Sequence, residues 1–445
     1  MAQSILIRKA DGTFEFLKSD GSGRLEAAIS GITGTVNTQL TGSSAENVTN
    51  IKLLSNATEI PASAMSGRRT VLVSNNGNGG NVYVGEAGID VGEGIKIAPN
   101  CPPVEIMASQ SEQVYGISEP FYFLNGGISF SYRSLVYLPR RDEFIGSIGE
   151  KIYSSTDRGK TWAVVSSELS GAVTVEASTL FVNRELDDGE YELIAGSRAG
   201  VNGLYIFRSQ DSGRTWSTVS AVDRTALCSI GDFTKTDSGI ILGVSVSSAS
   251  NGRGIIRSTD NGATWSQISM ASLRSVEFTE GQTVFAGTSY ATSDNLYRST
   301  DDGENWSAVA SFDRNAFGLF YIGSDTLIVR SQGDGTDRKI RKFGNIHAAA
   351  VGDITNTIVH DDVGPPAGRT AAVFGNRIIL GEDDGLLISE DSGDNWVLCH
   401  THLTSDNILK YGPKNILLSS ENEATLGIYA SSDGGIVPIS VVEGA

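Results

Sequence analysis

Cysteine is scarce in this chain of 445 residues, which contains three: Cys101, Cys228 and Cys399. They lie far apart, are odd in number and show no CxxC spacing. A disulfide framework or a zinc site of the usual spacing is therefore not expected. We predict three free thiols and no bound metal at them.

Long hydrophobic runs are also missing. No apolar stretch approaches the roughly 20 residues that a membrane-spanning helix requires, and MAQSILIRKADG has no apolar segment of signal-peptide length. We therefore expect neither membrane insertion nor an export signal.

Basic residues are too few to balance the acidic ones. The chain has 34 Lys and Arg against 52 Asp and Glu, a formal net charge of −18. Because binding to a phosphate backbone relies on a basic surface, we expect no nucleic-acid partner. What the chain does have is 52 glycines, abundant Val, Ile and Thr, and few long helix-forming runs. This composition favours an all-β fold with many turns.

An eight-residue pattern, S-x-D-x-G-x-[T/N]-W, occurs five times and contains all five tryptophans. We call each copy a box. The boxes are STDRGKTW (155–162), SQDSGRTW (209–216), STDNGATW (258–265), STDDGENW (299–306) and SEDSGDNW (389–396). Their defining residues are Ser155, Asp157, Gly159, Trp162; Ser209, Asp211, Gly213, Trp216; Ser258, Asp260, Gly262, Trp265; Ser299, Asp301, Gly303, Trp306; and Ser389, Asp391, Gly393, Trp396.

The spacing of the boxes predicts seven units. Successive leading serines are 54, 49, 41 and 90 residues apart, and the last step spans two periods. KIRKFGN (339–345) fills that gap, and SSDGGIVP (431–438) follows the fifth box, so two units carry an eroded box. Short apolar strands flank most boxes, and a period of 41 to 54 residues is typical of a propeller blade of about four strands. The sequence thus predicts a seven-bladed β-propeller over residues 119–445.

The residue types in a box indicate a tight turn. The Asp carboxylate can accept backbone N–H groups, and Gly can take a positive φ at little cost. The Ser hydroxyl adds a local hydrogen bond, and the Trp offers a large apolar side chain that can pack against the neighbouring sheet. We interpret the box residues as structural and not catalytic.

The box pattern resembles the Asp box (BNR repeat) of sialidase-like β-propellers over roughly residues 120–443. The resemblance implies that the boxes lie on the blade periphery, away from the central site. Glycosidases, sorting receptors and assembly factors all carry such boxes, so the resemblance indicates the fold and leaves the chemistry open.

The residues before the propeller predict two further parts. Residues 1–44 read as short strands broken by Asp-Gly and Ser-Gly turns, which indicates an arm or docking segment. Residues 45–118 predict a small β-sandwich-like module, in which residues 68–88 form two strands joined by an Asn/Gly hairpin. VYGIS (114–118) would close the module.

The stretches RRTVLVSNNG, NVYVGEAGIDVGEGIKI and VYGIS resemble a small β-module of structural proteins in tailed-phage virions, and GSGRLEAAISGITGTVN is similar to virion sequences as well. This resemblance implies a virion protein that is made in the host cytoplasm and exposed on the particle. Its partners would be other virion proteins, contacted through residues 1–118.

Catalytic residues of the sialidase type are hard to find in this sequence. The resemblance implies that glycoside hydrolysis would need three arginines for the substrate carboxylate, a Tyr nucleophile paired with Glu, and an acid/base Asp. Tyr132-Arg133-Ser134-Leu135 resembles the family's arginine motif but lacks the Ile-Pro that should follow Arg133. Arg133 is thus a ligand candidate weighed against an ordinary strand residue, and we assign no catalytic residue.

Other polar candidates favour structural roles. Arg208, Arg257 and Arg298 precede boxes at equivalent positions, where they would form a ring and not a converging triad. Tyr411 and Tyr429 have no distinctive local Glu partner, and the pair His400 and His402 has no third metal ligand. The acidic runs at 187–188 and 382–384 read as hairpin tips. We predict no metal and no cofactor.

These observations favour a phage virion structural protein, a fibre or decoration protein of head, neck or tail, whose propeller attaches to host-surface glycans. We expect a homo-oligomer, because multivalency strengthens weak sugar binding. An alternative is a divergent sialidase-like glycoside hydrolase acting on host surface polysaccharide. A third interpretation makes the propeller a scaffold for other virion proteins.

Overall fold

The computed structural model is all-β in the parts that it describes. These are residues 4–8, 14–18, 48–53, 58–60, 70–75, 81–85, 95–98, 104–107, 114–119, 122–126, 128–130, 134–166, 169, 177–197, 202–247, 254–269, 273–288, 296–310, 315–332, 337–363, 370–382, 385–399, 407–420, 427–432 and 437–444. Helical structure in these ranges consists of two short 3₁₀ turns, η1 (Pro139–Arg141) and η3 (Val351–Asp353). None of the described helices is long and apolar enough to cross a membrane. The all-β prediction is confirmed.

The chain divides into two compact units. Residues 1–45, with residue 445, form one, and residues 46–444 form the other. The first unit contains an antiparallel hairpin of β1 (Ser4–Arg8) and β2 (Phe14–Lys18), with Arg8 opposite Phe14. This hairpin lies within the segment predicted as an arm.

A small module of two four-stranded sheets takes seven of its strands from the chain before the propeller and one, β37 (Val437–Gly444), from the chain after it. One sheet has the order β3 (Val48–Leu53), β37, β5 (Thr70–Asn75), β8 (Val104–Met107). The other has the order β4 (Thr58–Ile60), β9 (Val114–Glu119), β6 (Asn81–Gly85), β7 (Ile95–Ile97). Val73 of the first sheet and Val82 of the second are fully buried, and the Asn75 side-chain amide donates to the Ile97 carbonyl at 3.0 Å.

Two features of this module differ from the sequence prediction. The strands of residues 68–88 exist, but they do not form a hairpin, because β5 pairs with β37 and β8 while β6 pairs with β7 and β9. The predicted propeller range, 119–445, also runs past the last propeller strand, since β37 pairs with β3 and β5 of the module. A strand from beyond the propeller thus takes the place that the hairpin partner was expected to fill.

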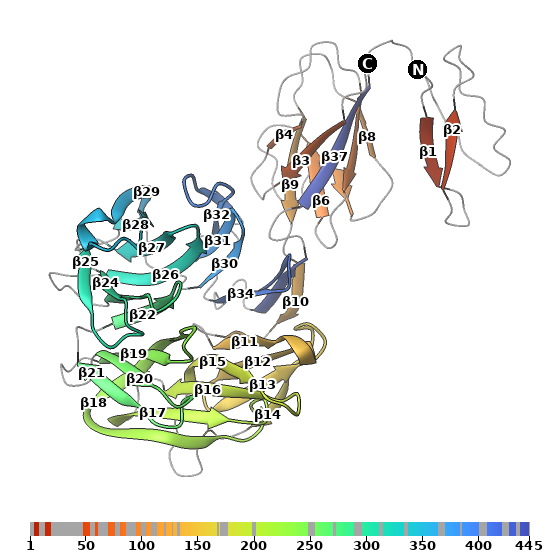
Figure 1. The fold of residues 1–445 in the computed structure, drawn as a ribbon. Helices are drawn as coiled ribbons and strands as arrows, with labels where there is room; N and C mark the ends of the chain where they lie inside the picture. Colours follow the sequence, from red (N-terminus) through yellow and green to blue (C-terminus); the bar gives the residue numbers. More distant parts are fainter. Residues whose placement is uncertain are drawn as a thin grey trace. The chain divides into compact units, whose positions relative to one another are not determined.

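The larger part is a seven-bladed β-propeller, as predicted (Figure 1). We number its antiparallel sheets blades 1 to 7 in chain order. Blade 1 holds β11 (Leu135–Leu138), β12 (Glu143–Ile148), β13 (Lys151–Ser155) and β14 (Ala163–Ser166). Blade 2 holds β15 (Ala177–Glu185), β16 (Tyr191–Ser197), β17 (Asn202–Ser209) and the first half of β18 (Ser217–Lys235). Blade 3 holds the second half of β18, then β19 (Ile241–Ser247), β20 (Gly254–Ser258) and β21 (Ser266–Ser269).

The remaining blades repeat this plan. Blade 4 holds β22 (Leu273–Phe278), β23 (Val284–Thr288), β24 (Leu296–Ser299) and β25 (Ser307–Ala310). Blade 5 holds β26 (Asn315–Gly323), β27 (Thr326–Gln332), β28 (Asp337–Gly344) and β29 (Thr355–Val363). Blade 6 holds β30 (Ala371–Phe374), β31 (Arg377–Glu382), β32 (Gly385–Ser389) and β33 (Val397–Cys399).

Blade 7 closes the ring with a strand from the other end of the propeller sequence. Its strands are β34 (Asn407–Tyr411), β35 (Asn415–Ser420), β36 (Gly427–Ser431) and β10 (Tyr122–Gly126). β10 pairs with β36, with Gly126 opposite Gly427, and supplies the outermost strand. Figure 1 shows β10 beside the blue strands of the last blade. The Phe130 backbone N–H, just after β10, donates to Ser419 Oγ at 2.6 Å.

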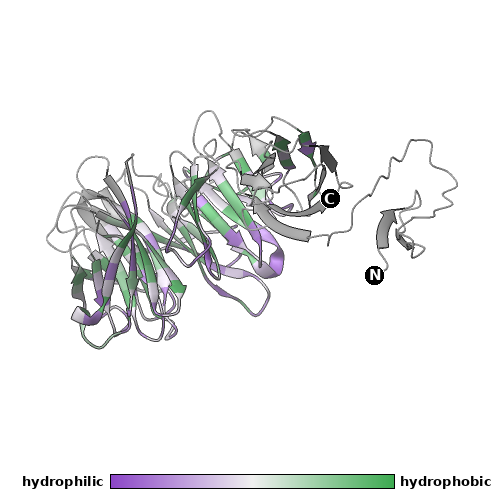
Figure 2. Cartoon of the chain, turned by 90° about the horizontal axis from the view of Figure 1, so that it is seen from above, coloured by the Kyte–Doolittle hydropathy of each residue, from purple (hydrophilic) through white to green (hydrophobic). Residues whose placement is uncertain are grey.

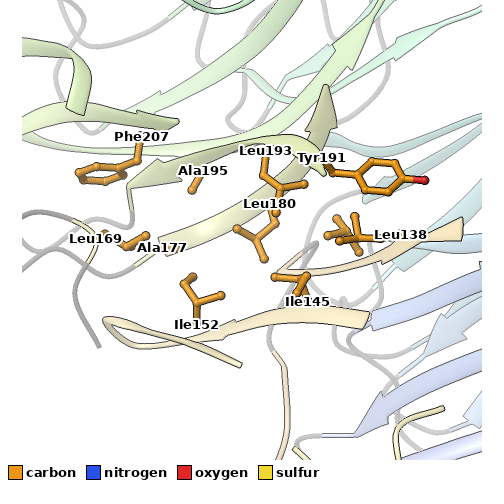
Figure 3. Close-up of a cluster of buried hydrophobic side chains, with 11 residues drawn as sticks. Leu138, Ile145, Ile152, Leu169, Ala177, Leu180, Tyr191, Leu193, Ala195 and Phe207 are labelled. Carbon is orange, nitrogen blue, oxygen red and sulfur yellow. The ribbon is translucent and has the colours of Figure 1, made fainter. Parts of the chain in front are cut away.

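Hydrophobic clusters fill the junctions between neighbouring blades. In the cluster of Figure 3, Leu138, Ile145 and Ile152 of blade 1 pack with Leu180 and Leu193 of blade 2. The corresponding cluster between blades 7 and 1 contains Leu417, Ile428, Leu135 and Phe144. Figure 2 shows the hydrophobic residues along the strands and hydrophilic ones at many of their ends. Burial between blades is thus what holds the ring.

Candidate functional site

Each box forms a closed network of hydrogen bonds. In the first box, Ser155 Oγ donates to Asp157 Oδ1 at 2.9 Å and accepts from the Gly159 backbone N–H at 2.9 Å. The Thr161 backbone N–H and hydroxyl donate to the two oxygens of Asp157 at 2.9 and 2.6 Å. The Trp162 indole N–H donates to the Gly159 carbonyl at 3.0 Å. The four other boxes repeat these contacts, except that the side-chain amides of Asn305 and Asn395 replace the Thr hydroxyl in the fourth and fifth boxes.

These bonds fix the ionisation of the box carboxylates. Hydrogen bonds from the backbone N–H of Asn395, and then from its side-chain amide, lower the pKa of Asp391 to about 2. Burial raises the pKa of Asp157, Asp211 and Asp301, but the bonds of the turn outweigh it, and the pKa of each lies below the usual value. The carboxylates are therefore ionised structural acceptors at neutral pH.

Each box rests on the preceding blade. The box Gly residues all have positive φ, between 78° and 88°. A Cβ at Gly303 of blade 4 would lie 2.7 Å from the Leu242 Cδ atoms of blade 3. Equivalent contacts link Gly159 to Leu417, Gly213 to Ile145, Gly262 to Ile194 and Gly393 to Ile328. The boxes join the third strand of a blade to its outermost strand, and they dock one blade onto the next.

Blade 5 docks without a box. Phe343 pairs with Leu327 where boxed blades have the leading Ser, which places Asn345 at the Asp position and His347 at the Gly position. The side chain of His347 forms two hydrogen bonds, between Nδ1 and Asp325 Oδ1 at 2.6 Å and between Nε2 and the hydroxyl of Thr279 in blade 4 at 2.9 Å. In blade 7, Ser431 keeps the leading position opposite Ile416, and residues 433–436 lie outside the described part.

The three arginines before boxes contact structural partners. Arg257 donates to the Asp302 carbonyl at 3.0 Å, and Arg298 donates to the Ile346 and Ala348 carbonyls at 3.1 and 2.7 Å. Both reach the turn of the following blade. Arg208 donates to the buried Glu192 of its own blade. These contacts agree with the structural interpretation of the arginines.

A pocket of about 650 Å³ lies on the side of the boxes, where blades 7, 1 and 2 meet. We call it the seam pocket. Tyr411 and Lys410 of blade 7 line it together with Tyr137, Asp142 and Arg158 of blade 1. The ring centroids of Tyr137 and Tyr411 lie 5.4 Å apart. The ring centroid of Phe144 lies 4.9 Å from that of Tyr137 and 4.8 Å from that of Tyr411. The aromatic wall is thus anchored in the core between the first and last blades.

Asp142 connects the polar groups of the seam pocket. It has a positive φ of 45° after η1 and accepts from the Tyr137 hydroxyl at 2.7 Å. Burial, followed by this bond, raises the pKa of Tyr137 to about 12. The Arg158 guanidinium lies 3.5 Å from the other Asp142 oxygen and is two-thirds exposed. Lys410 donates to the Val373 carbonyl at 2.5 Å and lies over the Phe374 ring at 4.7 Å. The pocket therefore presents an aromatic wall beside fixed polar groups.

A second pocket, of about 300 Å³, lies among the innermost strands of the blades. Its acidic residues are Asp232 and Glu277. Asp232 accepts from the Val276 backbone N–H at 3.0 Å, and Glu277 accepts from the Tyr321 N–H at 3.2 Å. Each carboxylate thus bridges its innermost strand to that of the next blade. We assign a structural role to both.

The remaining candidates fall outside the site or outside the described part. Arg133, His400, His402 and the acidic residues 383–384 lie outside the described residues. Asp188 lies at an exposed hairpin tip, where it accepts from the Glu190 N–H at 3.0 Å. Within the described ranges, no group of three or more His, Cys, Asp or Glu side chains is placed to hold a metal ion.

Sequence reasoning considered Tyr411 as a nucleophile and set it aside for want of a Glu partner, and it did not consider the other residues of the seam pocket. Tyr137, on β11, and Asp142, just after η1, belong to no motif. Both lie at the start of the propeller sequence, and closure of the ring brings them to Tyr411 near its end. The sequence could have pointed to Arg158, because this residue occupies the variable position between the Asp and the Gly of its box.

Comparison with known proteins supports the fold. No protein-family model and no curated protein matches the chain. Similar solved structures include the RRP9 WD40 repeats, with 8% identity and a TM-score of 0.51 over 72% of this chain and 97% of that one. YCF48 from Cyanidioschyzon merolae has 12% identity and a TM-score of 0.49, over 72% of this chain and 98% of that one. A GH74 enzyme from Niastella koreensis has 15% identity and a TM-score of 0.39, over 82% and 64%. The likeness to the RRP9 repeats, with its TM-score above 0.5, supports a propeller fold.

Proposed function

We propose that this protein is a virion structural protein whose Asp-box propeller binds host-surface glycans in the seam pocket. The observation that carries the glycan-binding part is the composition of this pocket. Two tyrosines stand beside a guanidinium, a carboxylate and an amide, contributed by Arg158, Asp142 and Asn415. Sugars offer both apolar C–H faces and hydroxyl groups, and a pocket that combines rings with a few fixed polar groups suits them.

Rigidity supports the same proposal. Tyr411 is the last residue of β34 and is 7% exposed, and Asp142 is held by its bond to Tyr137. A site whose groups are already in place loses little conformational freedom on binding, which favours useful affinity for a small ligand.

The virion part of the proposal rests on the sequence patterns of residues 1–118. The separate unit of residues 1–45, with its β1/β2 hairpin, suits an arm that docks on other particle proteins. The hydrogen-bonded turns and their docking on the preceding blade support the assignment of the repeats as Asp boxes.

Binding is favoured over hydrolysis at the seam pocket. Glycoside hydrolysis commonly uses two carboxyl groups on either side of the scissile bond. Among the described residues that line this pocket, Asp142 is the single carboxylate, and it already accepts from Tyr137. A sugar held here would therefore meet one engaged carboxylate and no paired acid and base.

The test is calorimetric binding of host-surface oligosaccharides to the full chain and to matched variants. Arg158→Asn removes the guanidinium, and Asn suits the backbone because Asn261 has a φ of 56° at the same position of another box, against 61° for Arg158. Tyr137→Leu removes one ring. Ser392→Asn changes the equivalent position of the fifth box, outside the pocket, as a control.

We expect each pocket variant to weaken binding about tenfold or more, as loss of a hydrogen-bonded charged group or of an aromatic contact does. The control should bind as the unchanged chain does. Equal affinity in all four proteins would reject the seam pocket, and release of reducing sugar during the titration would establish the hydrolase alternative.

A further inference from the structure

The strand that follows the propeller completes the module that precedes it. β37 is an interior strand of its sheet and pairs on both sides. On one side Val48 to Leu53 of β3 face Val442 to Val437, and on the other Asn75 to Thr70 of β5 face Ile439 to Gly444. β3 and β5 do not pair with each other, so β37 occupies the slot between them.

Without β37 this sheet would lose most of its pairing. β3 would have no partner in the sheet, and β5 would keep β8, with four paired positions from Thr70 opposite Met107 to Val73 opposite Val104. An isolated pair of strands is marginally stable at best in water. The loss would also remove the strand beside Val73, which is fully buried and pairs with Val441 of β37. The second sheet, β4-β9-β6-β7, does not include β37.

Closure of the propeller ring brings β37 to this slot. β10 follows the module in the chain and β36 precedes β37, and the two strands pair, with Gly126 opposite Gly427. Before closure, 394 residues separate Val48 from Val442; after closure the path runs from 48 to 126 and from 427 to 442, which is 93 residues. Because the effective concentration of two chain segments falls as about the −3/2 power of the linker length, closure favours insertion roughly ninefold.

We propose that the slot between β3 and β5 is a strand-accepting site for residues 437–444, and that the module is the last part of residues 46–444 to fold, after the ring closes. The folding claim stands independently of glycan binding. Its consequence, that a chain with an unfinished propeller presents no finished module for docking, rests on the proposed function.

The test compares the full chain with a chain that ends at residue 436. All five tryptophans lie in propeller boxes, so their fluorescence reports the propeller and not the module. Hydrogen exchange at the amides of residues 48–53 and 70–75 reports the slot. A chain that starts at residue 46 is the matched control, since residues 1–45 form a separate unit.

We expect slot amides to exchange at least about 100-fold faster in the chain that ends at 436, while the unfolding midpoint by tryptophan fluorescence stays unchanged. Added peptide VPISVVEG, residues 437–444, should restore protection, and the same peptide with Val441→Pro should not, because proline removes a ladder donor. If the shortened chain aggregates, Val441→Pro in the full chain should give the same loss.

Three results would overturn the proposal. Slot amides that stay protected in the shortened chain would show that β37 is dispensable. A tryptophan midpoint that falls together with slot protection would show that propeller and module unfold as one. Pulse-labelled refolding in which β3 and β5 are protected before the tryptophan signal recovers would reverse the order of folding.

Discussion

Blades 4 and 5 dock on their preceding blades in different ways. Blade 4 uses a box, in which Gly303 at φ 78° lies against Leu242 and the carboxylate of Asp301 closes the turn. Blade 5 has no box and buries Ile346 completely against blade 4, while Arg298 of blade 4 holds the carbonyls on both sides of His347. Both turns join the third strand to the outermost one. The box is thus one solution to a packing problem, and its presence indicates shape and not reactivity.

The largest effect on the free energy of unfolding is expected from the tryptophan of a box. Trp396 is 9% exposed and packs with Ile328 of blade 5 and Ile378 of blade 6. Trp396→Ala should lower the free energy of unfolding by about 3–5 kcal/mol, because it opens a cavity between the blades. Urea denaturation followed by circular dichroism measures this. A loss under about 1 kcal/mol would show that the box tryptophan does not hold the junction.

The junction without a box should be nearly as sensitive. Ile346→Ala removes a fully buried side chain from the cluster that contains Phe285 and Leu296 of blade 4. We expect a loss of about 2–4 kcal/mol in the same denaturation experiment. Should this variant prove as stable as the unchanged chain, blade 5 would not depend on an apolar anchor in place of the box.

Acid should weaken the boxed junctions selectively. The folded pKa of Asp391 is about 2, below its usual value of 3.8, so its contribution to stability is complete above about pH 4 and is lost as the pH falls towards 2. Asp391→Asn should cost about 1–2 kcal/mol at pH 7, because an amide N–H would then face the Asn395 side-chain amide.

In addition, Asp391→Asn should flatten the dependence of stability on pH between 4 and 2. The equivalent position of blade 5 holds Asn345, which has no carboxyl group to titrate. Unfolding midpoints measured across this pH range would contradict the assignment if variant and unchanged chain showed the same slope.

The smallest effect is expected at the variable position of the box. Arg158 is two-thirds exposed and its ion pair with Asp142 spans 3.5 Å. Exposed pairs contribute little, so Arg158→Asn should change the free energy of unfolding by less than about 0.5 kcal/mol. A thermal unfolding scan checks this, and a larger loss would mean that Arg158 supports the fold and cannot serve as a clean probe of the seam pocket.

The sequence predicted what is local and repeated. The boxes marked the blades because their residues bond within eight positions, and the spacing predicted all seven sheets. It did not predict the exchange of strands between distant segments. β10 pairs with β36, and β37 pairs with β3, across more than 300 residues, and no turn chemistry encodes such partners.

The sequence could not predict the seam pocket for the same reason. Tyr137 and Tyr411 are separated by 274 positions and meet where blades 1 and 7 join. The predicted Asn/Gly hairpin of β5 and β6 does not form because β5 pairs with β37 and β8, and local sequence reasoning cannot identify β37 as a partner.

A double-mutant cycle between Gly303 and Leu242 tests the docking of a box on the preceding blade most directly. Gly303→Ala places a Cβ 2.7 Å from the Leu242 side chain and should cost about 1–3 kcal/mol. In a chain that already carries Leu242→Ala, the contact is gone and the added cost should shrink, giving a coupling energy of about 0.5–3 kcal/mol. Additive effects of the two substitutions would contradict the account, because they would show that the turn of blade 4 does not rest on blade 3.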